Sequence, residues 1–105
     1  MPLFWAAGPF RVDVYKRQLR CCVAYPKLNL KVVGTHSGIS LGEDGPSQMS
    51  IEETALACAL AGFVVISPAD EISCKALFRA AVAHVGPVFV RTSRPKAPIL
   101  SLIHI

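Results

Sequence analysis

The run with the most chemical potential in this chain extends from Thr35 to Gln48 and reads THSGISLGEDGPSQ. It places one imidazole, two carboxylates and one amide among three glycines and a proline. Imidazoles and amides donate and accept hydrogen bonds, and a carboxylate accepts them from hydroxyls. A connection of this length is uncommon in a compact domain unless it binds or gates something. We therefore expect a binding loop, presented by a rigid scaffold.

The hydrophobic pattern predicts the scaffold that holds this loop. Three apolar runs are typical of buried strands: residues 28–34, 63–66 and 88–90. A capping box at Ser50 and Glu53 predicts one helix between them, and Asp70 is expected to cap a second, over about residues 71–84. Strands that alternate with helices indicate an α/β fold, here a partial open parallel sheet with helices on its faces.

This topology predicts where a ligand would bind. In open parallel sheets, ligands lie beyond the carboxyl ends of the strands. His36 follows the first strand, Ser67 follows the second, and Arg91, Ser93 and Arg94 follow the third. We expect these polar side chains to meet at one edge of the sheet, and the opposite edge carries no comparable set.

The two ends of the chain contain segments that are inverted copies of each other at the nucleotide level. Residues 13–18, DVYKRQ, can be encoded by GATGTGTATAAGAGACAG, whose reverse complement encodes LSLIHI, the sequence of residues 100–105. Selection for a fold gives no reason for such a pair, so we interpret both as a sequencing-library transposon adaptor. We thus predict a foreign or adaptor-derived leader at 1–18, an authentic domain at 19–99 and an adaptor-derived tail at 100–105.

Composition excludes several classes of protein. A chain of 105 residues allows one domain, and 52% hydrophobic against 17% charged residues is too apolar for disorder. Residues 19–99 hold eight Lys and Arg against six Asp and Glu, a net charge of +2 against +4 for the whole chain. They show no basic stripe with interleaved aromatics, so we expect no nucleic-acid partner. The apolar runs are too short for a membrane helix, and we find no signal peptide.

Four cysteines, Cys21, Cys22, Cys58 and Cys74, form no CxxC pair, and no histidine lies at zinc-ligand spacing from them. We therefore expect reduced, buried cysteines in a cytoplasmic protein and no metal site.

The loop at residues 35–48 resembles the signature loop of transketolases. Four flanking runs resemble the same family: VAYPKLN at 23–29, SPADE at 67–71, GPVFVR at 86–91 and RPK at 94–96. The resemblance covers residues 19–99, and the Ser-Gln ending of the loop is closer to animal-type and some split bacterial transketolases than to the commoner Thr-His form. It implies a fragment, a C-terminal section or subunit, of the thiamin diphosphate-binding fold: the pyrimidine-binding domain of a transketolase of the pentose phosphate pathway. That enzyme transfers a two-carbon ketol unit between sugar phosphates.

The resemblance also implies roles for individual residues. His36 matches a substrate-contacting histidine, Asp44 an aspartate that accepts a substrate hydroxyl, and Arg94 an arginine that binds the substrate phosphate. Gln48 occupies a cofactor-contacting position where many relatives carry histidine, and its amide can orient the aminopyrimidine but cannot shuttle a proton. No residue of this chain matches a catalytic group or a metal ligand. We expect Glu43 to be structural, and Arg91 and Lys96 to be solvated charges.

Much of a thiamine-diphosphate site is implied to lie outside these residues. The glutamate and the aromatic pocket for the pyrimidine ring would precede residue 19, and another domain would hold the diphosphate with its Mg or Ca ion. The parent enzyme would be a dimer with the cofactor between subunits, so we expect the isolated chain to be inactive. Two alternatives stay open: a fragment of deoxyxylulose-phosphate synthase or of a 2-oxoacid dehydrogenase β subunit, and a non-catalytic phosphate-binding module.

Overall fold

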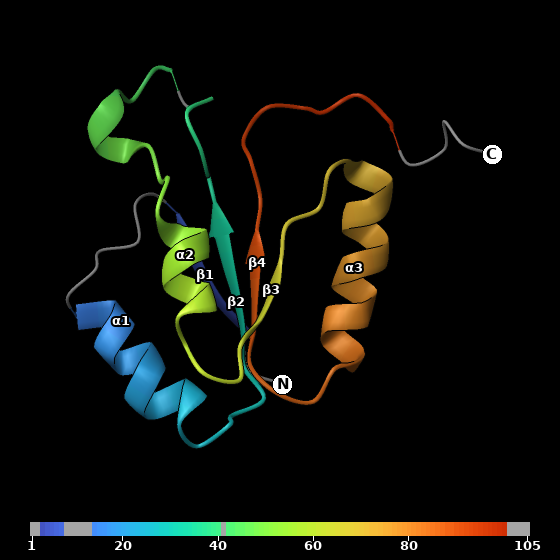
Figure 1. The fold of residues 1–105 in the computed structure, drawn as a ribbon. Coiled ribbons are helices and arrows are strands. Elements are labelled where there is room, and N and C mark those ends of the chain that lie inside the picture. The colour runs from blue at the N-terminus through green and yellow to red at the C-terminus, as the bar shows by residue number, and fades with distance from the viewer. Residues whose placement is uncertain (1–2, 8–13, 41, 101–105) are drawn as a thin grey trace.

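A computed structural model of the chain describes residues 3–7, 14–40 and 42–100. Its centre is a four-stranded parallel sheet with the strand order β1-β2-β4-β3. The strands are β1 (Leu3–Ala7), β2 (Lys31–Thr35), β3 (Val64–Ile66) and β4 (Val88–Arg91). The expected partial open parallel α/β sheet is therefore confirmed, and its helices lie on both faces (Figure 1).

The sheet has one strand more than the three that the sequence predicts. β1 pairs with β2 from Leu3 opposite Lys31 to Ala7 opposite Thr35, so it forms one border of the sheet. It comes from the segment that we interpret as foreign. The adaptor-derived part of that segment, residues 13–18, overlaps α1 (Val14–Gln18), and residues 101–105 of the predicted tail at 100–105 lie outside the described residues.

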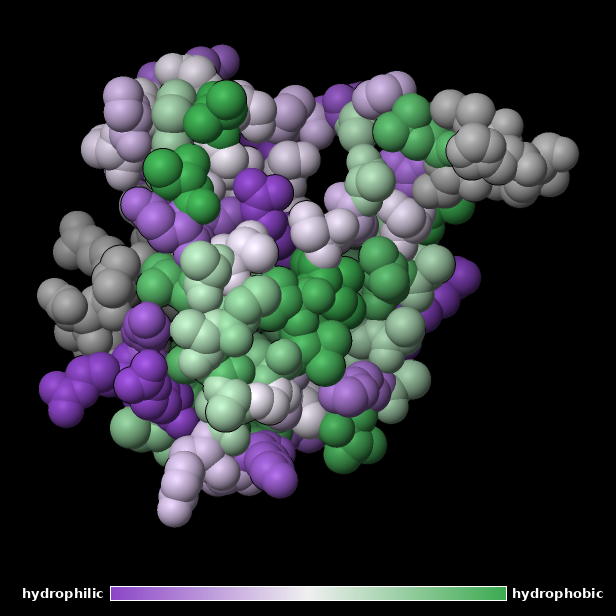
Figure 2. All heavy atoms as spheres, in the orientation of Figure 1, coloured by the Kyte–Doolittle hydropathy of each residue, from purple (hydrophilic) through white to green (hydrophobic). Residues whose placement is uncertain are grey.

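Apolar side chains on the two faces of β2 and β4 form two cores. On one face, Val32 and Phe89 pack with the π-helical turn η1 (Leu19–Ala24) and with α2 (Glu53–Cys58). On the other, Val33, Val88 and Val90 pack against α3 (Glu71–Ala83). Strands that are covered on both faces have continuous apolar sequences, which is why β4 could be predicted from the sequence. Figure 2 shows an apolar band over the middle of this view and hydrophilic groups above it.

Asp70 caps α3 as predicted. Its Oδ1 accepts a hydrogen bond from the Ser73 backbone N–H at 2.8 Å, and the Ser73 hydroxyl oxygen accepts one from the Asp70 N–H at 3.0 Å. This reciprocal pair satisfies two backbone donors that the helix itself leaves unpaired. The cap fixes the start of α3 beyond the end of β3.

The predicted capping box at Ser50 and Glu53 is wrong. α2 begins at Glu53, its N-cap is Glu52, and no side chain caps it. The Ser50 hydroxyl instead donates to Glu53 Oε2 at 2.8 Å, while Glu53 Oε1 accepts from Arg91 Nε at 2.5 Å. The carboxylate is thus shared between the nearby Ser50 hydroxyl and a tertiary ion pair with Arg91.

The cysteines are also more exposed than predicted. All four carry unpaired thiols; Cys21, Cys22 and Cys58 are exposed and Cys74 is half-buried. In the part of the chain that the structure describes, no helix is long and apolar enough to cross a membrane.

The amino-end edge of the sheet holds a buried cation that sequence reasoning missed. Lys31 is 2% exposed, and its Nζ donates to Asn29 Oδ1 at 2.5 Å and to the carbonyl oxygens of His84 and Gly86 at 2.8 and 2.6 Å. Burial lowers the pKa of this amine. The contacts tie the start of β2 to the turn between α3 and β4, so Lys31 has a structural role at this edge.

Candidate functional site

The carboxyl ends of β2, β3 and β4 lie at the same edge of the sheet, as parallel pairing requires. Three connections leave the sheet there: residues 36–50 after β2, residues 67–70 after β3 and residues 92–100 after β4 (Figure 1). Loops beyond the carboxyl ends of parallel strands are the usual place for a ligand site. This edge is therefore the candidate site.

The structure brings Arg94 and Asp44 together. Arg94 Nη1 lies 3.6 Å from Asp44 Oδ2, and Arg94 Nη2 lies 3.5 Å from Glu43 Oε2. Arg94 follows β4 and the two acids lie in the loop after β2, so the contact joins segments that are far apart in the sequence. Both pairs are solvent-exposed, so each contributes little to stability, typically below ~1 kcal/mol. The guanidinium is thus held near the loop but can exchange partners.

His36 lies at the start of the same loop. Its Nδ1 is 2.9 Å from the hydroxyl oxygen of Thr35, and its Nε2 has no hydrogen-bond partner among residues 3–7, 14–40 and 42–100. The backbone of His36 is left-handed, with φ of 62°. This conformation is unfavourable for a residue with a Cβ atom and marks a place where the surrounding structure fixes the chain.

Gln48 ends a short 3₁₀ turn, η2 (Pro46–Gln48), that follows Gly45. Its backbone N–H donates to the carbonyl of Gly45 at 3.1 Å, and the residue is exposed. The amide is therefore presented to solvent by a closed turn.

The sequence predicted other roles for Arg91 and Glu53 than the structure shows. Arg91 was expected to be a solvated charge, but it pairs with Glu53, whose side chain is only 3% exposed. Burial raises the pKa of Glu53, but hydrogen bonds from Arg91 and Ser50 outweigh it and leave that pKa below its ordinary value. The signal available in the sequence was the position of Arg91, directly after three apolar residues of a buried strand.

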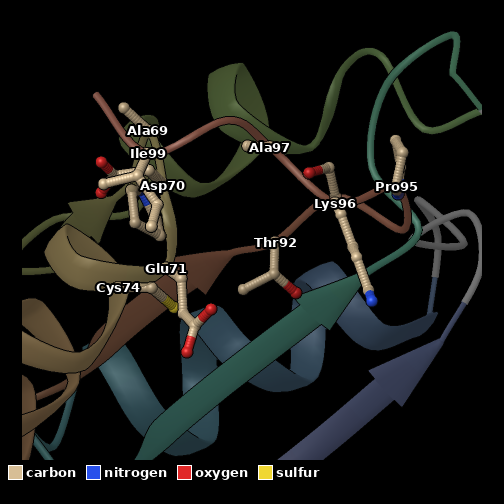
Figure 3. A pocket seen from close by; sticks show the side chains of 11 residues that line it. Ala69, Asp70, Glu71, Cys74, Thr92, Pro95, Lys96, Ala97 and Ile99 are labelled. Carbon is tan, nitrogen blue, oxygen red and sulfur yellow. The ribbon is translucent and has the colours of Figure 1, made fainter. Parts of the chain in front are cut away.

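A cavity of about 460 Å³ opens at this same edge, between the start of α3 and the segment after β4 (Figure 3). Its polar lining comes from Asp70, Glu71, Cys74, Thr92, Ser93 and Lys96. None of the four residues that the sequence assigns to substrate or cofactor lines it. The Asp70 carboxylate is engaged by the backbone N–H groups of Ser73 and Leu100, both at 2.8 Å, so we assign the cavity no ligand.

Comparison with known proteins identifies the domain. The family model of the transketolase pyrimidine-binding domain matches residues 7–99. The chain belongs to this family. The match begins inside the segment 1–18, and the boundary at residue 19 stays a prediction.

Curated relatives carry transketolase names. This pyrimidine-binding domain is 44% identical over 82 residues to a protein of Methanocaldococcus jannaschii described as a transketolase C-terminal section, covering 78% of this chain and 26% of that one. It is 36% identical over 77 residues to transketolase of Homo sapiens, covering 73% and 12%. The chain therefore spans about a quarter or less of the length of these relatives.

A solved structure shares the fold. A split-gene transketolase, described as an inactive β4 tetramer, superposes with a TM-score of 0.77 and is 31% identical in sequence. The superposition covers 96% of this chain and 32% of the other. The expected thiamin diphosphate-binding fold of the pyrimidine domain is thus confirmed for this transketolase domain.

Proposed function

We propose that this chain supplies the pyrimidine-side part of a transketolase, an enzyme that transfers a two-carbon ketol unit from a ketose phosphate to an aldose phosphate. The observation that carries the proposal is the contact between Arg94 and Asp44 at the candidate edge of the sheet. Arg94 offers parallel donors to phosphate oxygens, and Asp44 accepts a sugar hydroxyl. One sugar phosphate would replace the contact between them.

His36 would contribute the third contact to the sugar phosphate. With Nδ1 engaged by Thr35, the Nε2 atom is left to face a hydroxyl or a phosphate oxygen. The left-handed backbone of His36 would fix the direction of the ring. In this proposal His36, Asp44 and Arg94 bind and orient the substrate, and none of them takes part in bond making.

The exposed amide of Gln48 fits one part of thiamine diphosphate, the aminopyrimidine, because an amide can both donate to and accept from that ring. No three His, Cys, Asp or Glu residues gather into a metal site within the described ranges 3–7, 14–40 and 42–100. As the family resemblance implies, we assign the diphosphate and its divalent ion to a second domain or subunit. When bound, the cofactor supplies the reactive carbon that amino-acid side chains lack.

We predict that the isolated chain has no ketol-transferase turnover, since it holds only part of the cofactor's site. Mixed with a diphosphate-binding section of a split transketolase, thiamine diphosphate and Mg²⁺, it should bind an aldose phosphate without turning it over, because the glutamate for the pyrimidine ring is implied to precede residue 19. Arg94→Ala should then raise the Kd for that sugar phosphate at least about tenfold, as expected for one lost charged hydrogen bond. Arg79→Ala, an exposed arginine on α3, is the matched control. Turnover by the chain alone, or equal effects of the two substitutions, would contradict the proposal.

Glu43→Gln is expected to strengthen anion binding at Arg94. Glu43 competes with an anion for the guanidinium of Arg94. The Glu43 side chain is 85% exposed, so this ion pair is weak. Removing an exposed ion pair releases up to ~1 kcal/mol, so inorganic phosphate should bind up to about fivefold more tightly. The measurement is an NMR titration of the Arg94 side chain. Glu71→Gln removes the same charge from α3, and an equal gain there would show a general charge effect instead.

A further inference from the structure

The two ends of the loop at residues 36–50 are tied to each other and to the end of β4. Ser37 and Ser50 are buried and form an isolated parallel bridge. The N–H of Gly38 donates to the carbonyl of Ser50 at 2.8 Å, and the N–H of Ser37 donates to the carbonyl of Thr92 at 3.2 Å. The loop therefore leaves the sheet and returns to it at one point, directly after His36.

An ion pair lies behind this point. Glu53, on α2, accepts from Arg91 Nε at 2.5 Å and from the Ser50 hydroxyl at 2.8 Å. The Arg91 guanidinium also runs close to Gly38, where an added Cβ atom would lie 3.2 Å from Nη2. Gly38 has φ of +85°, so a side chain is disfavoured there both by the backbone and by the guanidinium. The pair thus contacts both ends of the loop at once.

The strain at His36 indicates why such an anchor is needed. A left-handed backbone is unfavourable for a residue with a Cβ atom, and it persists only where neighbouring contacts enforce it. The residues that follow His36 are held by hydrogen bonds to Thr92 and Ser50, and the guanidinium lies close to Gly38. Without these contacts the backbone of His36 could relax to an ordinary conformation and turn its imidazole away from the site.

We propose that Glu53 and Arg91 form a positioning pair, which holds Ser37 and Gly38 in place and so aims the His36 ring at the ligand. Neither residue contacts the substrate in this proposal. The role of His36 toward a sugar phosphate rests on the proposed function above, but the anchoring of its backbone does not.

The test uses the full chain with both members of the pair replaced, Glu53→Met with Arg91→Met. Replacing a buried ion pair by apolar residues of similar volume is often neutral for stability, so this variant separates positioning from folding. We expect hydrogen exchange at the Ser37 and Gly38 amides to become about tenfold faster or more, with unchanged exchange at Val88, whose N–H donates to Leu30 inside the sheet. The ring-proton shifts of His36 should move as well, which a purely structural role would not cause.

The control replaces the exposed pair on α3, Glu71→Met with Lys75→Met, and should leave the Ser37, Gly38 and His36 signals unchanged. Unchanged exchange at Ser37 and Gly38 in the Glu53→Met, Arg91→Met variant would overturn the proposal. If the Val88 amide of that variant also exchanges faster, the sheet itself has been disturbed, and the single substitution Arg91→Lys becomes the test of the positioning role. Lysine keeps the charge beside Glu53 but has no Nη2 beside Gly38, so Gly38 exchange should rise, and no change would refute the pairing.

A second measurement separates this inference from the proposed function. If the wild-type chain, complemented by its diphosphate-binding section, shows no affinity for an aldose phosphate, the proposed function fails. The hydrogen-exchange experiment needs no ligand, so it tests the anchoring of the loop independently of the proposed function.

Discussion

Phe89→Ala is expected to lower the free energy of unfolding by about 3–5 kcal/mol, which is the cost of a large cavity in a packed core. Phe89 is 1% exposed and packs against η1 and α2 from the centre of β4. Its ring lies directly over β2, where a Cβ atom added to Gly34 would stand 3.1 Å from it. Domains of this kind are stable by roughly 5–15 kcal/mol in total, so the loss would unfold a large part of the population. Urea unfolding followed by circular dichroism measures it.

Val85→Ala is the control for this prediction, because Val85 is exposed and follows α3. It should change stability by less than about 0.5 kcal/mol. Equal losses from the two substitutions would mean that β4 does not form the centre of the core.

Three of the four strands and the helix α3 could be predicted because local sequence determines them. The apolar runs at 63–66 and 88–90 are typical of parallel strands; β4 is buried within the sheet, whereas β3 lies at its border and is only partly buried. Asp70 caps α3 through a residue three positions away, so the cap is contained in the local sequence. The parallel topology then placed the loop after β2 beside the segment after β4.

The ion pairs could not be predicted, because each depends on a partner that is distant in the chain. The Glu53 carboxylate accepts from the nearby Ser50 and also from the distant Arg91, and only the first contact is contained in the local sequence. Lys31 lies inside the run that predicted a buried strand, and the turn after α3 supplies its carbonyl acceptors. A polar residue inside an apolar strand indicates that a hydrogen-bond partner must be present, because burying it unpaired is unfavourable. The sequence does not indicate which residue that partner is.

In the candidate site, too, some contacts could be predicted from the sequence and others could not. That Arg94 and Asp44 would share an edge followed from the topology, and the structure places them 3.6 Å apart. That Glu43 would share the same guanidinium did not follow, because loop conformation depends on the turn at Gly45 and Pro46. The roles of His36, Asp44, Arg94 and Gln48 toward substrate and cofactor stay predictions that come from the family resemblance.

Arg91→Met alone should be costly, in contrast to the double replacement. It leaves the Glu53 carboxylate buried without its guanidinium, and breaking a buried pair in this way costs about 3 kcal/mol or more at neutral pH. Lys75→Met removes the cation of the exposed pair with Glu71 and should cost less than ~1 kcal/mol. Urea unfolding at pH 7 compares the two variants.

The cost of Arg91→Met should also depend on pH, with a sign fixed by Glu53. In the wild type the pKa of Glu53 is held below its ordinary value of 4.5, so the stability from this group is present above that value and is lost as the pH falls through the folded-state pKa. In the variant, burial is no longer outweighed by Arg91 and should raise the pKa of Glu53, so its carboxyl takes up a proton earlier and the buried charge disappears. The difference in unfolding free energy between wild type and variant should therefore shrink as the pH is lowered from 7 toward 4. A difference that stays constant over that range would show that Glu53 is not the group left uncompensated.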